Sequence, residues 1–172
     1  MKTIFSLMLL CAFGLHVSAQ SLKSILVNQL KTTHDKQEWF VPVKIALEGV
    51  TAEQAVWNDD SGNHSIGQLA HHLLFWNERV LVKLKGEQQA PFDGSNEKTF
   101  DSFNKAQWEQ TVKRLSEVLQ EFESMIQNGD EDFLKTWAET IANISTHNAY
   151  HTGQIIFVRK LQGSWNPENG VK

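Results

Sequence analysis

Cysteine is almost absent from this sequence of 172 residues, in which Cys11 is the single one. Cys11 lies in an N-terminal segment that we expect to be removed, so the mature chain would contain no thiol. It could then form no disulfide, and no thiolate could serve as a nucleophile or a metal ligand. A cysteine-free domain relies on its hydrophobic core, and the six Trp and ten Phe residues are consistent with that.

The first residues have the pattern of a signal peptide. Lys2 provides a basic start, residues 4–17 are mostly apolar, and Val17-Ser18-Ala19 has the small residues of a signal-peptidase site. We therefore expect a signal peptide over residues 1–19, cleaved after Ala19, and a periplasmic or secreted location. The apolar stretch is shorter than the ~20 residues of a transmembrane helix, so no stable membrane anchor is expected.

Basic patches, strand patterns and phosphate-binding loops are also missing. The formal net charge is −4, and the charges occur in short runs of mixed sign, which makes nucleic acid a poor candidate partner. No Gly-rich loop follows a strand and no nucleophile elbow is present, so nucleotide binding and serine hydrolase chemistry are disfavoured. Residues 20–172 suffice for one domain with one hydrophobic core.

The hydrophobic periodicity is helical along the mature chain. Long helices are expected over residues 22–47, 66–85, 105–127 and 136–162. Pro42 should kink or divide the first of them. Capping boxes begin at Thr51, Ser65 and Thr136, where each opens a helix, and Asn104 should cap the third long helix. Each long helix is followed by a glycine that can end it.

Residues 87–103 form a long connection between the second and third of these helices. In a compact domain, such a connection crosses between distant helices or covers a site. Four long helices with one long connection predict an all-α fold, a four-helix bundle. Bundles build ligand and metal sites from side chains on facing helices.

His147 and His151 lie four residues apart in the last predicted helix, and therefore on one face. On a helical wheel, the centre of the apolar arc lies within roughly 20° of His151 and roughly 60° of His147. Both imidazoles should point inward, where their nitrogens need partners. A divalent transition metal is one such partner, because this spacing recurs in metal sites. The alternative is that each ring bonds a carbonyl or carboxylate in the core.

A third ligand would come from another helix, and the candidates are His34, His64, His71 and His72. On the second long helix, His72 lies on the flank of the apolar arc at about 100° from its centre, and His71 lies on the solvent side at about 160°. Geometry therefore favours His72. His64 is expected in a loop, and no pattern recommends His34. Three histidines with an open position suit Zn²⁺ or Ni²⁺.

Other residues near the pair allow two interpretations each. Gln154 lies on the flank of His147 and either orients a ligand or is a plain surface amide. Tyr150 points away from the core arc and is assigned to packing or to the surface. Gly153 allows close approach of another backbone, or is a tolerated weak point of the helix. Asp59-Asp60 is interpreted as solvated loop charge, and the Trp and Phe residues at helical spacing as core.

At these residues the sequence resembles the DinB-like (DinB/YfiT) superfamily of small metal-binding helical proteins. In residues 64–76, the superfamily has its first metal histidine seven residues after a Ser or Thr, which corresponds to His72. Residues 146–154 are similar to its H-x-x-x-H-x-G-Q segment, which corresponds to His147 and His151. The helix order and the long connection also agree, so the resemblance covers nearly all of the mature chain.

The resemblance implies an up-down-down-up four-helix bundle, a divalent-metal site at His72, His147 and His151, and frequent homodimers. Some members are thiol-dependent transferases or isomerases, and others are described as metal-dependent hydrolases. The export signal departs from most members. We therefore expect an exported DinB-like domain over residues 20–172, a metal-dependent transferase or hydrolase acting on a small electrophilic substrate. The alternative is a noncatalytic metal- or ligand-binding bundle with a structural ion.

Overall fold

A computed structural model describes residues 21–101 and 103–170 of the chain. All regular elements in these residues are helices, so the all-α prediction is confirmed. The long helices are α1 (Leu22–His34), α4 (Ile66–Leu84), α6 (Trp108–Asn128) and α7 (Glu131–Leu161). The short ones are α2 (Val43–Leu47), α3 (Ala52–Val56), α5 (Lys98–Asp101) and two 3₁₀ turns, Lys105–Gln107 and Pro167–Asn169. The expected signal peptide lies outside the described residues.

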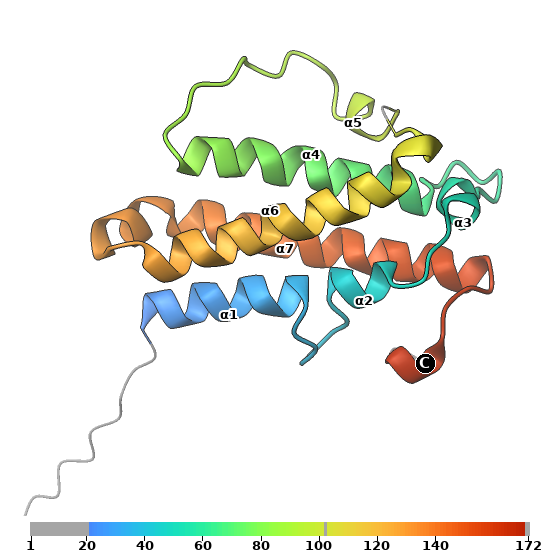
Figure 1. Ribbon diagram of the computed structural model, residues 1–172, viewed down its shortest axis with the longest axis horizontal. Helices are drawn as coiled ribbons and strands as arrows, with labels where there is room; N and C mark the ends of the chain where they lie inside the picture. Colours follow the sequence, from blue (N-terminus) through green and yellow to red (C-terminus); the bar gives the residue numbers. More distant parts are fainter. Residues whose placement is uncertain (1–20, 102, 171–172) are drawn as a thin grey trace, which may run out of the picture.

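The long helices lie side by side (Figure 1), and α1 and α4 each pack against both α6 and α7. α1 and α7 run in one direction, whereas α4 and α6 run in the opposite direction (Figure 1). Because α4 and α6 are parallel, the chain between them returns along the length of α4 before α6 begins. α5 forms within this connection and packs on α4, the helix that carries His72.

The first helix ends earlier than predicted. α1 stops at His34, and an irregular segment separates it from α2, whose N-cap is Pro42. The division expected at Pro42 is therefore present, but the break begins well before the proline. The reason is burial, because Val41 and Val43 are both 2 % exposed and the chain must turn inward to place them in the core.

Two of the three predicted capping boxes are confirmed. The side chain of Thr51 accepts a hydrogen bond from the Gln54 backbone, and the Gln54 side chain accepts one from the backbone of Thr51. Ser65 and Gln68 make the same reciprocal pair at the start of α4. These local bonds satisfy backbone donors that the first helical turn leaves free.

The third box, at Thr136, is wrong. The last helix already begins at Glu131, where the Asp130 side chain accepts from the Phe133 backbone nitrogen. Thr136 lies inside α7, and its hydroxyl donates to a backbone carbonyl one turn earlier. Asp130 is a strong N-cap, and the acidic residues that follow it favour a helix start through the helix dipole.

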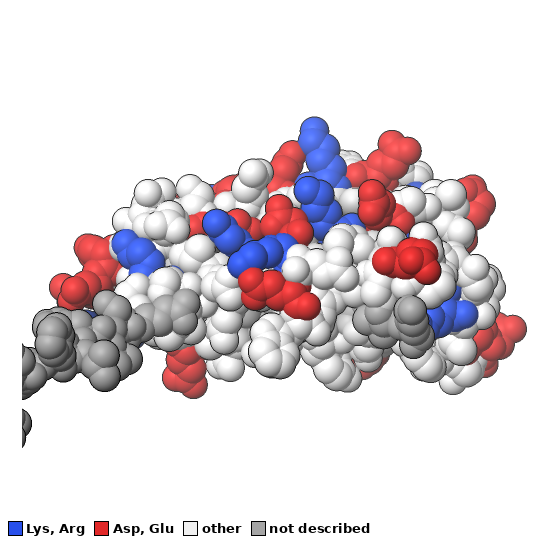
Figure 2. Space-filling view, turned by 90° about the horizontal axis from the view of Figure 1, so that it is seen from below, with Lys and Arg blue, Asp and Glu red and all other residues white. Residues whose placement is uncertain are grey.

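The core consists mainly of aliphatic residues between the helices, and Phe122 is fully buried among them. The expectation that aromatic residues belong to the core fails for Trp39, which is 95 % exposed. Trp39 lies in the irregular segment after α1, so helical spacing does not describe its direction. On the face shown in Figure 2, basic and acidic side chains are interspersed. No helix within the described residues is long and apolar enough to cross a membrane.

Candidate metal site

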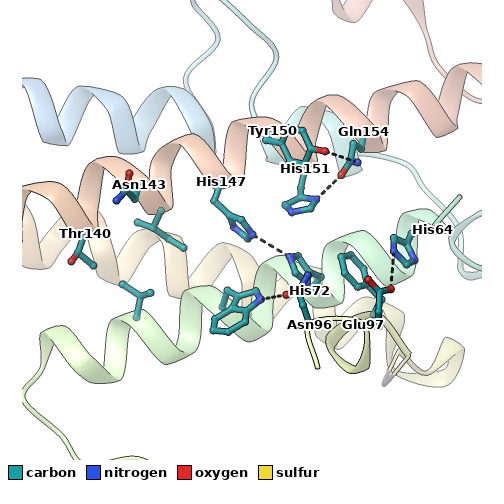
Figure 3. A pocket seen from close by; sticks show the side chains of 14 residues that line it. His64, His72, Asn96, Glu97, Thr140, Asn143, His147, Tyr150, His151 and Gln154 are labelled. Atoms are coloured by element: carbon teal, nitrogen blue, oxygen red, sulfur yellow. Dashed lines mark hydrogen bonds and ion pairs between the residues drawn. The ribbon is translucent and has the colours of Figure 1, made fainter. Parts of the chain in front are cut away.

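Three imidazoles meet between α4 and α7 (Figure 3). His72 comes from α4, and His147 and His151 come from successive turns of α7. The Nε2 atoms of His72 and His147 are 3.1 Å apart, and one nitrogen from each of the three rings lies within 4.8 Å of the others. The structure thus brings together the three histidines that the sequence singled out.

Two of these rings have a side-chain oxygen within hydrogen-bond distance of Nδ1. The Thr99 hydroxyl lies 2.5 Å from Nδ1 of His72, and Oε1 of Gln154 lies 2.6 Å from Nδ1 of His151. With Nδ1 engaged in each ring, Nε2 is left to bind a further group. Of the two interpretations of Gln154, the structure supports the orienting one. Thr99 was missed because the connection that carries it has no periodic pattern.

The alternative to a metal site is a core cluster in which each ring bonds a carbonyl or carboxylate of the protein. His151 bonds one such oxygen, the side-chain carbonyl of Gln154, but His72 bonds a hydroxyl and Nδ1 of His147 is buried without a partner. Two nitrogens that bind one Zn²⁺ at its usual distance and tetrahedral angle would be about 3.3 Å apart, close to the 3.1 Å separation of His72 and His147. The donor set therefore fits a divalent ion.

Burial also keeps these rings in the form that binds metals. It lowers the pKa of His72 to about 3 and that of His147 to about 4, with a further contribution from the neighbouring imidazoles. Burial lowers the pKa of His151 as well. All three rings are therefore neutral near pH 7, and a neutral imidazole is the form in which histidine ligates a metal.

His71 and His64 also lie near this cluster, but their surroundings differ from those of the three converging rings. His71 was expected on the solvent side, but it is half-buried and its Nδ1 lies 2.9 Å from the backbone carbonyl of Thr99, because the connection covers that face of α4. His64 precedes α4, as expected for a loop residue. Its ring stacks on Phe100 at 3.8 Å, and Phe100 also stacks on His72 at 4.0 Å.

A pocket of about 710 Å³ opens beside the three histidines (Figure 3). Its apolar wall consists of Trp76, Val80, Phe100 and Ile144, and its polar wall of His64, Asn96, Glu97, Thr140, Asn143, Tyr150 and Gln154. Tyr150 was assigned to packing or to the surface, and it is 62 % exposed while also lining this pocket. The pocket therefore combines apolar surface with several hydrogen-bonding groups, as small-molecule sites do.

A buried amide pair fixes α4 against α7 next to the histidines. Asn77 and Asn148 exchange two hydrogen bonds, of 2.7 and 3.1 Å, and both side chains are essentially inaccessible to solvent. Asn77 also donates to the backbone carbonyl of Leu73. Asn77 was not predicted from the sequence, although its spacing of four residues from both Leu73 and Leu81 places it on their buried face.

Gly153 does not have the function first considered for it. It is exposed, and a Cβ atom added there would meet nothing within 4 Å. The prediction of close backbone approach at Gly153 is therefore wrong for this chain, and the interpretation as a tolerated weak point of the helix stands. Asp59 and Asp60 lie in an exposed loop, as predicted, where Asp59 accepts hydrogen bonds from Ser61.

A second group of potential ligands lies between α1 and α6 and includes His34 and Glu123. Nδ1 of His34 lies 2.6 Å from a carboxylate oxygen of Glu123, and its Nε2 lies 3.2 Å from the Ser116 hydroxyl. Both ring nitrogens therefore already have partners within the protein. This cluster has the bonding of a structural contact between two helices.

We predict that replacing His34 with asparagine leaves metal stoichiometry unchanged at one ion per chain. The variant should lose about 1–3 kcal/mol of stability, because Glu123 would lose its buried partner. Metal analysis after dialysis measures the first effect, and urea unfolding measures the second. Two ions per chain in the unmodified protein, falling to one in the His34→Asn variant, would contradict this interpretation.

The fold and the site together define a class of protein: a helical domain in which histidines from two facing helices converge beside a pocket. The chain belongs to the DinB superfamily, whose family model matches residues 43–155. That range contains His72, His147 and His151, and the family predicted from their motifs is confirmed. No curated protein and no solved structure shows a significant match to the chain.

Proposed function

We propose that this protein is an exported, divalent-metal-dependent enzyme in which His72, His147 and His151 hold Zn²⁺ or Ni²⁺. The observation that carries the proposal is the convergence of three neutral imidazoles beside a pocket of about 710 Å³. Among the described residues, the cluster includes no fourth His, Cys, Asp or Glu. Catalytic zinc sites have three protein ligands and an open position, whereas structural sites have four.

The proposed reaction is a transfer to, or hydrolysis of, a small electrophilic molecule. A divalent ion bound here would supply a Lewis acid that polarises a carbonyl and lowers the pKa of a water or a thiol. The rings of Trp76 and Phe100 would exclude water from one wall, and the amide of Asn143 would orient the substrate. Nε2 of His64, 3.7 Å from the carboxylate of Glu97, is placed to exchange a proton with a molecule in the pocket.

The remaining parts of the proposal come from the sequence and from the family. The helix directions support an up-down-down-up four-helix bundle. The signal pattern supports export, and the intact mass of the protein from its natural host tests it, with Gln20 expected as the first residue. A homodimer is also proposed, and light scattering of the purified protein measures it.

The enzyme proposal is tested with protein loaded with Zn²⁺ or Ni²⁺ and freed of excess ion. One assay combines a low-molecular-weight thiol with 1-chloro-2,4-dinitrobenzene, and the other follows hydrolysis of 4-nitrophenyl acetate. We expect turnover in at least one of the two assays. This turnover should require the ion, and it should be lost when His147 and His151 are both replaced by alanine. One tightly bound ion without turnover in either assay would instead favour a noncatalytic bundle with a structural ion.

A further inference from the structure

The connection between α4 and α6 contacts His72 through two buried side chains, those of Thr99 and Phe100. Thr99 is 2 % exposed, and its hydroxyl lies 2.5 Å from Nδ1 of His72. The same hydroxyl donates to the backbone carbonyl of Asn96 at 2.6 Å, and the Asn96 side chain accepts a hydrogen bond from the indole of Trp76. Asn96 therefore links the two, because its backbone accepts from Thr99 and its side chain accepts from Trp76 in the pocket wall.

The direction of the hydrogen bonds of Thr99 follows from which partners can donate a proton and which can only accept one. A carbonyl oxygen can only accept, so the single hydroxyl proton of Thr99 is committed to Asn96. The oxygen of Thr99 can then only accept from His72, which requires the proton of that imidazole to be on Nδ1. The neutral ring consequently has its lone pair on Nε2, the atom that faces His147.

We propose that Thr99 is a positioning residue that fixes the tautomer of His72 and thereby prepares Nε2 to bind the ion. The inference rests on the proposed function, because it assumes that the three histidines hold a metal. Outer partners of this kind fix the tautomer and orientation of ligand histidines, and their loss lowers metal affinity by about 10- to 100-fold. The segment that supplies Thr99 also supplies Asn96, Glu97 and Phe100 to the pocket.

Phe100 packs on the His72 ring independently of Thr99, so the effect of the Thr99 hydroxyl can be measured apart from packing. Its ring lies parallel to that of His72, with 4.0 Å between the ring centroids and 5° between the planes. The His64 ring stacks on Phe100 in the same way, at 3.8 Å and 2°. This stack fixes the plane of the His72 ring when the Thr99 hydroxyl is removed, so a change at position 99 acts mainly on the location of the proton.

The test compares Thr99→Val with Thr99→Ser. Valine has nearly the same shape as threonine but no hydroxyl, and serine keeps the hydroxyl. Zn²⁺ affinity, measured by competition with a chelator of known affinity, should fall about 10- to 100-fold in Thr99→Val and stay within about threefold in Thr99→Ser. Thr111→Val is the matched control, because Thr111 is also buried but lies on α6 outside the site.

A second readout detects the tautomer itself. In the ion-free protein, the ¹⁵N chemical shifts of His72 should show the proton on Nδ1, and in Thr99→Val they should move toward the Nε2-protonated form. A structural effect alone would not change this signature. The measurement on the unmodified protein needs no variant, so the proposal stays testable if Thr99→Val fails to fold.

The outcomes separate the two levels of the proposal. Unmodified protein that binds no ion would overturn the proposed function. Tight binding by the unmodified protein, with equal affinity in Thr99→Val, would overturn the assignment of Thr99 alone. A proton on Nε2 of His72 in the ion-free, unmodified protein would overturn that assignment as well.

Discussion

Replacing both His147 and His151 with alanine is expected to lower the affinity for Zn²⁺ or Ni²⁺ by about 1000-fold or more. The variant removes two of three converging imidazoles, and His72 alone cannot hold a divalent ion tightly. The reason lies in the geometry of α7, which presents the two rings from successive turns toward His72 on α4. Isothermal titration of the ion-free proteins measures the loss.

His34→Asn is the matched control for this experiment. His34 is also a buried histidine, but its partners Ser116 and Glu123 lie on α6, away from the cluster of His72, His147 and His151. Its replacement should leave affinity within about threefold of the unmodified value. Equal uptake by the unmodified protein and the His147→Ala, His151→Ala variant would contradict the metal site. Circular dichroism of both variants verifies that the helices are retained.

The three histidines could be predicted because their arrangement depends on helical periodicity. His147 and His151 are on one face of any helix that contains both, and the wheel of α4 favours His72 over His71. The reciprocal caps at Thr51 and Ser65 were predictable for the same reason, since each is a bond between residues three apart in the chain.

Features that depend on distant segments were not predictable from the sequence. Thr99 and the environment of His71 are set by a connection that folds back onto α4 without any periodic pattern. The same limit applies to His34, whose partners Ser116 and Glu123 come from a helix more than 80 residues away. No wheel of a single helix contains that information.

The two histidine clusters show why spacing alone does not identify a metal site. Both nitrogens of His34 are bonded within the protein, to a carboxylate and a hydroxyl, so that ring needs no further partner. In the cluster of His72, His147 and His151, Nδ1 of His72 and Nδ1 of His151 have side-chain partners, and Nε2 of His72 meets Nε2 of His147 beside a pocket. A metal site requires ring nitrogens whose lone pairs are free to bind the ion, in addition to rings that point inward.

The second large effect is expected at the amide pair between α4 and α7. Asn148→Leu should destabilise the protein by about 2–4 kcal/mol, because it removes two hydrogen bonds and leaves the Asn77 oxygen buried without a donor. Asn77→Leu should have a similar effect for the same reason. Urea unfolding with linear extrapolation measures both. Asn128→Leu, at an exposed position on α6, should change stability by no more than about 0.5 kcal/mol.

The double variant decides whether the pair acts as a unit. With both amides replaced by leucine, no buried amide is left without a partner, so the loss should be smaller than the sum of the single losses by about 1 kcal/mol or more. The pair also sets how α4 lies against α7, since Asn148 directly follows His147 and Asn77 is on the same helix as His72. Each single variant should therefore weaken metal binding too. Strictly additive losses with unchanged affinity would contradict the assigned coupling, because they would mean that the two helices keep their alignment without these hydrogen bonds.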